Sequence, residues 1–216
     1  MKQRHLWLGL TLAALGCEAE DDKTAGTDVG NPVVLALRAE PMQDAAVVDG
    51  AQARYRLVSA SGQVREVTLA VAGELSCADL GDLPGGTECT DGPTTLTLPG
   101  SLTADLVAGT LAPEAKVPGV AYDEARLRSG ASEQAQGLII ELAPEDDGRV
   151  VRIEVAPSAA LAFDPVEGEA GSFIADPAAW IGAVDLLSCA GAQPGEGPLR
   201  ITLDPTTGAC EPAQGR

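Results

Sequence analysis

The sequence predicts a mainly β protein, an antiparallel β-sandwich with one short helix near its C-terminus. Several short runs alternate apolar and polar residues, which is the period of a half-buried strand. Gly and Pro contribute 25 and 15 of the 216 residues, well above their average combined share of about 12%, so many tight turns are expected. Only one segment has the spacing of an amphipathic helix.

The clearest local pattern is a hairpin over residues 137–157, whose turn lies at Asp146 and Asp147. The predicted pairs are Leu142 with Val151, Ile140 with Ile153, Leu138 with Val155, and Glu141 with Arg152 on the opposite face. A shift by one residue would place charged side chains on the apolar face, so the register is well determined.

A second hairpin is predicted over residues 53–71, with Ser61, Gly62 and Gln63 as its loop. This loop would pair residue 57 with 67 and residue 55 with 69. Further strands are predicted at residues 33–39, 94–98, 102–108, 120–128, 159–163 and 199–203.

The single predicted helix follows Asp176, which can cap it, and Pro177, which suits the first turn. The residues on its apolar face are Trp180, Ile181, Val184 and Leu187. This spacing favours a core position for Trp180 over a role in ligand binding. Tyr122, on a predicted strand, is likewise expected in the core.

The N-terminus has the three parts of an export signal: Lys2 and Arg4, an apolar segment over residues 6–15, and then Gly16 and Cys17. The ending Ala-Leu-Gly-Cys resembles the lipobox of bacterial lipoprotein precursors; its last two positions match that motif and its first two are atypical. The resemblance implies that residues 1–16 are removed and that Cys17 is lipidated. Ordinary signal cleavage without a lipid is the alternative.

The cysteine count favours lipidation. The chain has five cysteines, and lipidation of Cys17 leaves an even number for disulfides in an oxidising compartment. Cys77 with Cys89 and Cys189 with Cys210 are the favoured pairs, because each pair brackets a turn-rich segment; the other pairings stay open. A four-thiolate metal site is disfavoured because no Cys-x-x-Cys spacing is present.

Residues 17–32 are predicted to be the lipidated cysteine and a disordered acidic tether, followed by a single β-sandwich domain over residues 33–216. The tether could hold the domain up to roughly 50 Å from the lipid. Its last part, residues 27–32, resembles the start of the ordered part of other uncharacterised bacterial lipoproteins, and we expect a turn there. In bacterial lipoproteins, the family that the lipobox resembles, an Asp directly after the lipidated Cys often retains the protein at the inner membrane. Glu18 only resembles it, so the outer membrane is the expected location.

Charge and residue types exclude several functions. Removal of Lys2 and Arg4 leaves 12 basic against 32 acidic residues, which disfavours nucleic-acid binding. The only histidine, His5, lies in the signal segment. The mature chain therefore has no imidazole for a catalytic triad, a general base or a typical zinc, copper or iron site.

Two acidic clusters are the remaining chemical candidates. The weak calcium candidates are Asp79, Asp82, Glu88 and Asp91 around the first cysteine pair, and Glu145, Asp146 and Asp147 at the hairpin turn. Calcium binds carboxylate and carbonyl oxygens, but neither cluster has EF-hand spacing. Acidic residues are also common in turns, where they bond the nearby backbone.

Three functional classes follow from these observations. The favoured one is a non-enzymatic envelope or cell-surface lipoprotein whose β-domain serves in binding or structural display, with an envelope protein as partner and no cofactor. The alternative is a ligand-binding module for calcium or a polysaccharide. A carboxylate-based hydrolase is the third class, since such chemistry needs no histidine, although no motif supports it.

Overall fold

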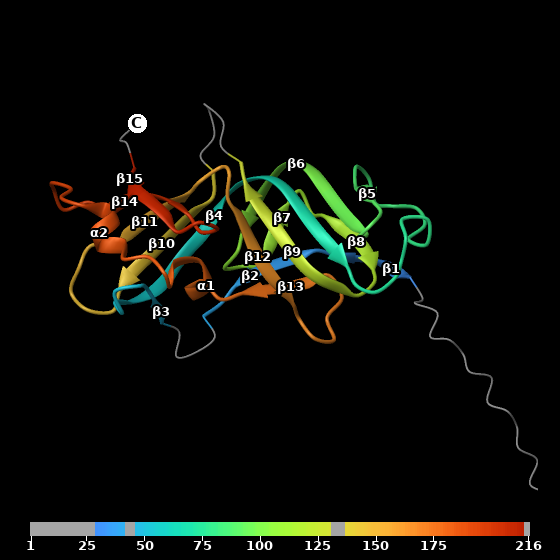
Figure 1. Cartoon of the computed structure of the whole chain (residues 1–216), viewed down its shortest axis with the longest axis horizontal. Coiled ribbons are helices and arrows are strands. Elements are labelled where there is room, and N and C mark those ends of the chain that lie inside the picture. Colours follow the sequence, from blue (N-terminus) through green and yellow to red (C-terminus); the bar gives the residue numbers. More distant parts are fainter. Residues whose placement is uncertain (1–28, 42–45, 131–136, 214–216) are drawn as a thin grey trace, which may run out of the picture.

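The computed structural model of the protein describes residues 29–41, 46–130 and 137–213 (Figure 1). The predicted signal peptide, Cys17 and most of the predicted tether lie outside these residues. The mainly β class is confirmed: the described chain forms a thirteen-stranded sheet and a two-stranded sheet, with two short helices. The buried hydrophobic side chains of the described residues form one core cluster, which agrees with the predicted sandwich.

The elements are as follows. The strands are β1 (Gly30–Val34), β2 (Ala36–Ala39), β3 (Val47–Val48), β4 (Arg54–Val71), β5 (Glu88–Thr90), β6 (Thr95–Asp105), β7 (Thr110–Ala112), β8 (Lys116–Gly119), β9 (Tyr122–Ser129), β10 (Ile139–Pro144), β11 (Val151–Val155), β12 (Ala160–Pro165), β13 (Ser172–Ala175), β14 (Leu199–Asp204) and β15 (Ala209–Pro212). The helices are α1 (Ala178–Ile181) and α2 (Leu186–Ala190).

The hairpin predicted over residues 53–71 is wrong, because this segment is the single continuous strand β4. Its first part pairs with β10, and its second part pairs with β9 on one side and with β6 along residues 61–70. Gly62 lies mid-strand with a φ of +150°, and a Cβ there would collide with the carbonyl oxygen of Gly137. The glycine therefore permits a close approach between two backbone segments. Glycine is also common in hairpin loops, so the sequence alone predicted a loop here.

The other predicted strands occur with altered limits. Residues 94–98 and 102–108 fall mostly in one strand, β6, whose pairing with β4 shifts register between Val64 and Glu66. Residues 33–39 are divided between β1 and β2 at Leu35, whose N–H donates to the carbonyl of Ala115. β1 also begins at Gly30, inside the segment predicted as tether.

The hairpin of β10 and β11 has the predicted register. Ile140 pairs with Ile153, and Leu142 pairs with Val151. On the other face Glu141 lies opposite Arg152, with 3.7 Å between the carboxylate and the guanidinium. β11 then continues the sheet through a parallel pairing with β14, so the sheet is mixed rather than entirely antiparallel.

The predicted single helix is two short helices, α1 and α2. The first helix ends at its C-cap Gly182, and the Asp185 carboxylate, which accepts the Ser188 N–H at 3.0 Å, caps the start of the second. Leu187, predicted on the buried face, is 54% exposed as a result. Trp180 is buried as predicted, with its ring 5.7 Å from that of Phe163.

The large sheet curls back on itself around the core (Figure 1). From β6 the strand order runs through β4, β9, β12 and β13 to β2, and the Ala39 N–H of β2 donates to Leu106, just after β6, at 2.8 Å. Tyr122, buried as predicted, lies inside this curve with its ring 5.8 Å from that of Phe173. Neither helix of the described chain has the length or the hydrophobicity needed to cross a membrane.

Candidate functional site

The first disulfide loop is fastened by its own acidic residues. Cys77 and Cys89 form a disulfide with a Cα–Cα distance of 5.8 Å. The Asp79 carboxylate accepts hydrogen bonds from the hydroxyl and the backbone N–H of Ser76, and these bonds hold the pKa of Asp79 below its usual value. The Asp91 carboxylate accepts the Cys77 N–H at 2.7 Å. The carboxylates of Asp79 and Asp91 thus accept hydrogen bonds from the backbone of the loop, as acidic residues in turns commonly do.

The structure does not bring the calcium candidates together as a metal site. Glu145 instead pairs with the Arg54 guanidinium at 2.7 Å. The other candidates, Asp82, Glu88, Asp146 and Asp147, are exposed. Within residues 29–41, 46–130 and 137–213, no group of three or more His, Cys, Asp or Glu side chains has an arrangement that could hold a metal ion.

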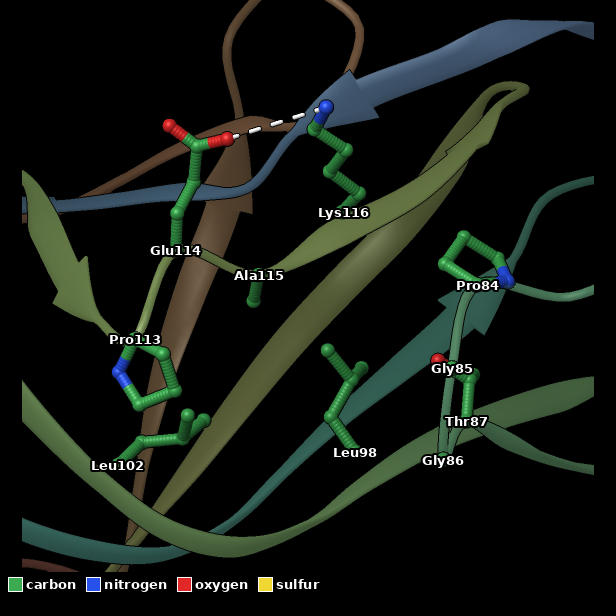
Figure 2. Close-up of a pocket in the computed structure, with 10 residues that line it drawn as sticks. All are labelled: Pro84, Gly85, Gly86, Thr87, Leu98, Leu102, Pro113, Glu114, Ala115 and Lys116. Atoms are coloured by element: carbon green, nitrogen blue, oxygen red, sulfur yellow. Dashed lines mark ion pairs between the residues drawn. The ribbon is translucent and has the colours of Figure 1, made fainter.

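A hollow of about 350 Å³ lies beside the first disulfide loop (Figure 2). One wall is the loop segment 84–87, and the other is the segment 113–116 that leads into β8. Figure 2 shows Leu98 and Leu102 of β6 between these walls. The disulfide and the two acids that fasten the loop therefore fix one wall of this hollow.

The chemical groups around this hollow suit binding. Its polar side chains are those of Thr87, Glu114 and Lys116, and Glu114 pairs with Lys116 at 3.9 Å on the exposed rim. An apolar floor with a charged rim can hold a ligand by burial and orient it by charge.

The second disulfide fastens the C-terminal part of the sheet. Cys189 of α2 and Cys210 of β15 have a Cα–Cα distance of 5.7 Å. The Arg149 guanidinium donates to the carbonyls of Gly197 at 2.6 Å and Gln193 at 2.7 Å, which ties down the loop between α2 and β14. The structure thus forms both of the disulfides that the sequence favoured.

Asp49, which was not among the residues predicted to matter, is 1% exposed. Its carboxylate accepts the N–H groups of Ala51 and Ala53 at 2.9 Å each, that of Leu186 at 3.3 Å, and the hydroxyl of Tyr55 at 3.4 Å. The pKa of Tyr55 is raised to about 12, mainly because the phenol is buried and to a smaller extent because the negative Asp49 carboxylate lies near it. The Asp-Gly dipeptide at residues 49–50 is a turn signal that could have pointed to this residue.

Asp49 connects two distant parts of the chain. The turn between β3 and β4 contacts the segment between α1 and α2, where the Gly50 N–H donates to the carbonyl of Val184 at 2.8 Å. A Cβ on Gly50 would lie within 3.0 Å of the backbone of Ala183 and Val184. We interpret this cluster as structural, because the bonds that the carboxylate accepts connect the turn before β4, Tyr55 and the start of α2.

Comparison with known proteins gives no family assignment: no protein-family model, no curated protein and no solved structure matches this chain. Its function is therefore inferred from its residues and their geometry. The features that bear on function are the N-terminal sequence, the two disulfides and the hollows on the surface of the β-domain.

Proposed function

We propose that this protein is an exported, lipid-anchored envelope protein whose β-domain binds a partner or displays its loops without catalysis. One observation carries the proposal: four of the five cysteines are paired within the domain, and Cys17 is the one that remains. Disulfides persist in oxidising compartments outside the cytosol. The remaining cysteine is also the one that ends the lipobox-like sequence.

The binding part of the proposal rests on the hollow in Figure 2. Its wall is held by a disulfide, so a ligand would meet a surface that loses little conformational entropy on binding. The non-catalytic part rests on chemistry: the chain after residue 16 contains no histidine, and the four paired cysteines have no thiolate to offer. The outer membrane is the proposed location.

The test is Cys17→Ser, expressed with its own signal in a Gram-negative bacterium and followed by fractionation and labelling with an alkyne fatty acid. The unmodified protein should carry the label and pellet with outer membranes, and the variant should be unlabelled and soluble in the periplasm. A Cys77→Ser, Cys89→Ser double variant serves as control and should keep the label. Membrane attachment of the unlabelled Cys17→Ser protein would overturn the anchor.

Catalysis is tested separately on the purified protein with esterase, glycosidase, peptidase and phosphatase substrates. We expect no turnover above that of buffer. Turnover that disappears when a single Asp or Glu is changed to Asn or Gln would contradict the non-catalytic proposal and identify the acid responsible.

A further inference from the structure

Strand β12 has an edge that lacks a partner strand over part of its length. Along one edge, residues 160–163 pair with β9. Along the other edge, β13 pairs only with Asp164 and Pro165. The chain then leaves the sheet at Asp176 and enters α1. In the ranges that the structure describes, no strand pairs with this second edge at residues 160–163.

The alternation of a strand shows which backbone groups this edge presents. The Val166 N–H donates to the carbonyl of Ser172 on the β13 side at 2.9 Å. Successive residues direct their N–H and C=O groups to opposite edges, so Ala160 and Ala162 direct theirs to the same side as Val166. Leu161 directs its groups to β9. The N–H and C=O groups of Ala160 and Ala162 thus form a short open ladder.

This open ladder borders a hollow of about 530 Å³. Ala160 and Ala162 direct only methyl groups to the face of the sheet that borders the hollow, so they leave room for the side chains of a strand added beside them. Trp180 of α1 also lines the hollow; it is 5% exposed, and its indole N–H has no hydrogen-bond partner. Within the described ranges it is the only buried side-chain polar atom without one. Buried polar groups normally have partners, so this unpaired N–H is an unusual feature in a residue that borders the open ladder.

The charged groups around the hollow are mainly acidic. Glu124, Asp164 and Asp176 line it together with one base, Arg126. The Arg126 guanidinium pairs with Glu124 at 2.8 Å, and the Asp176 carboxylate accepts the Ala178 N–H at 2.9 Å. The carboxylate of Asp164, which is exposed and lies beside the open ladder, can attract a cation. A ligand with a positive charge complements this surface.

We propose that the open edge of β12 binds an extended peptide segment of a partner protein, one that carries Lys or Arg and adds to β12 as a short strand. Alternating donors and acceptors at every second residue match a peptide backbone, which is the basis of recognition by strand addition. A sugar chain has no such repeat. The inference depends on the fold alone and is independent of the lipid anchor.

The probe is an acetylated eight-residue peptide of alternating threonine and valine in which two threonines are replaced by lysine. Binding to the purified ¹⁵N-labelled protein is followed by NMR through the Ala162 amide and the Trp180 indole, the latter assigned with Trp180→Phe. We expect both signals to shift in a saturable way. The same peptide N-methylated at every residue cannot donate from its backbone and should bind at least tenfold more weakly.

Variants of β12 separate strand addition from other modes of binding. Ala162→Pro removes an N–H that the ladder with β9 does not use, and edge strands tolerate proline. It should weaken the peptide at least tenfold while the amide signals of β9 and β4 keep their positions. Ala162→Ser retains the N–H and should bind within about twofold of the unmodified protein. Asp164→Asn should weaken the lysine peptide a few fold and reduce the salt dependence of its binding.

Several outcomes would overturn the proposal. They are the absence of any saturable shift up to millimolar peptide, equal binding of the N-methylated peptide, and unchanged binding to a folded Ala162→Pro variant. Equal affinity for a matched peptide with glutamates in place of the lysines would contradict the basic partner. Self-association that Ala162→Pro abolishes, measured by sedimentation velocity without peptide, would assign the edge to a second copy of this chain instead.

Discussion

Asp49→Asn is the substitution that most directly tests the structural account of the core. Asparagine has nearly the same shape as aspartate, and its carbonyl oxygen can still accept the N–H groups of Ala51 and Ala53. Its amide nitrogen, however, would replace the oxygen that accepts the Leu186 N–H and the Tyr55 hydroxyl. A donor would then face the buried backbone donor of Leu186.

The cost follows from these contacts. An unsatisfied buried donor costs about 1–3 kcal/mol, and the bond to the Tyr55 hydroxyl, which would have to accept from the amide instead of donating, adds up to about 1 kcal/mol if it is weakened. We expect the free energy of unfolding to fall by about 2–3 kcal/mol. For a chain of this size that corresponds to a decrease in Tm of roughly 4–12 °C. The assay is urea unfolding with both disulfides intact, with hydrogen exchange of the Leu186 amide as a local readout.

Asp105→Asn is the matched control. The Asp105 carboxylate accepts the N–H groups of Val107 and Ala108 through one oxygen, at 3.1 and 3.0 Å, but it is exposed. Its asparagine variant keeps that acceptor and leaves no buried donor unpaired, so it should cost less than about 1 kcal/mol. If Asp49→Asn is no more destabilising than this control, or leaves the protection of the Leu186 amide unchanged, the structural role given to Asp49 is wrong.

Three further results are expected. Burial raises the pKa of Tyr55 to about 12 and that of Tyr122 above its usual value, so absorbance at 295 nm should show both phenols ionising only above pH 10. Because the folded protein disfavours the ionised phenols, the free energy of unfolding should be unaffected by them below pH 10 and should fall as the pH rises from 10 through 12. A phenol ionising near pH 10 in the folded protein would contradict this. Replacing both Cys77 and Cys89 with Ser should lower stability by about 3 kcal/mol in urea, and peptide mapping without reduction should recover these two cysteines in one linked peptide, whereas linkage to another cysteine would refute the pairing. Gly62→Ala should cost at least about 2 kcal/mol because its Cβ meets a neighbouring backbone carbonyl; unchanged unfolding in urea would show that this close approach is absent.

The local sequence pattern was sufficient to predict the structure where residues close in sequence are also close in space. The hairpin of β10 and β11 has its predicted register because one apolar face and the pair of Glu141 with Arg152 exclude a one-residue shift. The burial of Trp180 and Tyr122 followed from periodicity for the same reason. Both favoured disulfides also join cysteines that are close in sequence, 12 and 21 residues apart.

Long-range pairing overrode local signals elsewhere. Ser61 and Gly62 have the composition of a hairpin loop, but β4 passes straight through them because β3, β10, β6 and β9 pair with it along its length. Gly62 meets Gly137, which lies far away in sequence, and no local rule could reveal that contact. The two helices likewise separate at Asp185, whose cap begins a second helix where periodicity alone predicts one.

The candidate sites divide in the same way. The sequence by itself determined the lipobox-like cysteine, the lack of histidine after residue 16 and the acidic surface, because these are properties of composition and order. Only the tertiary structure decided that Asp79 and Asp91 bond the backbone, that the first disulfide loop walls a hollow, and that Asp49 joins residues 137 positions apart. The open edge of β12 belongs to this second group, because whether a strand has a partner depends on where the rest of the chain goes.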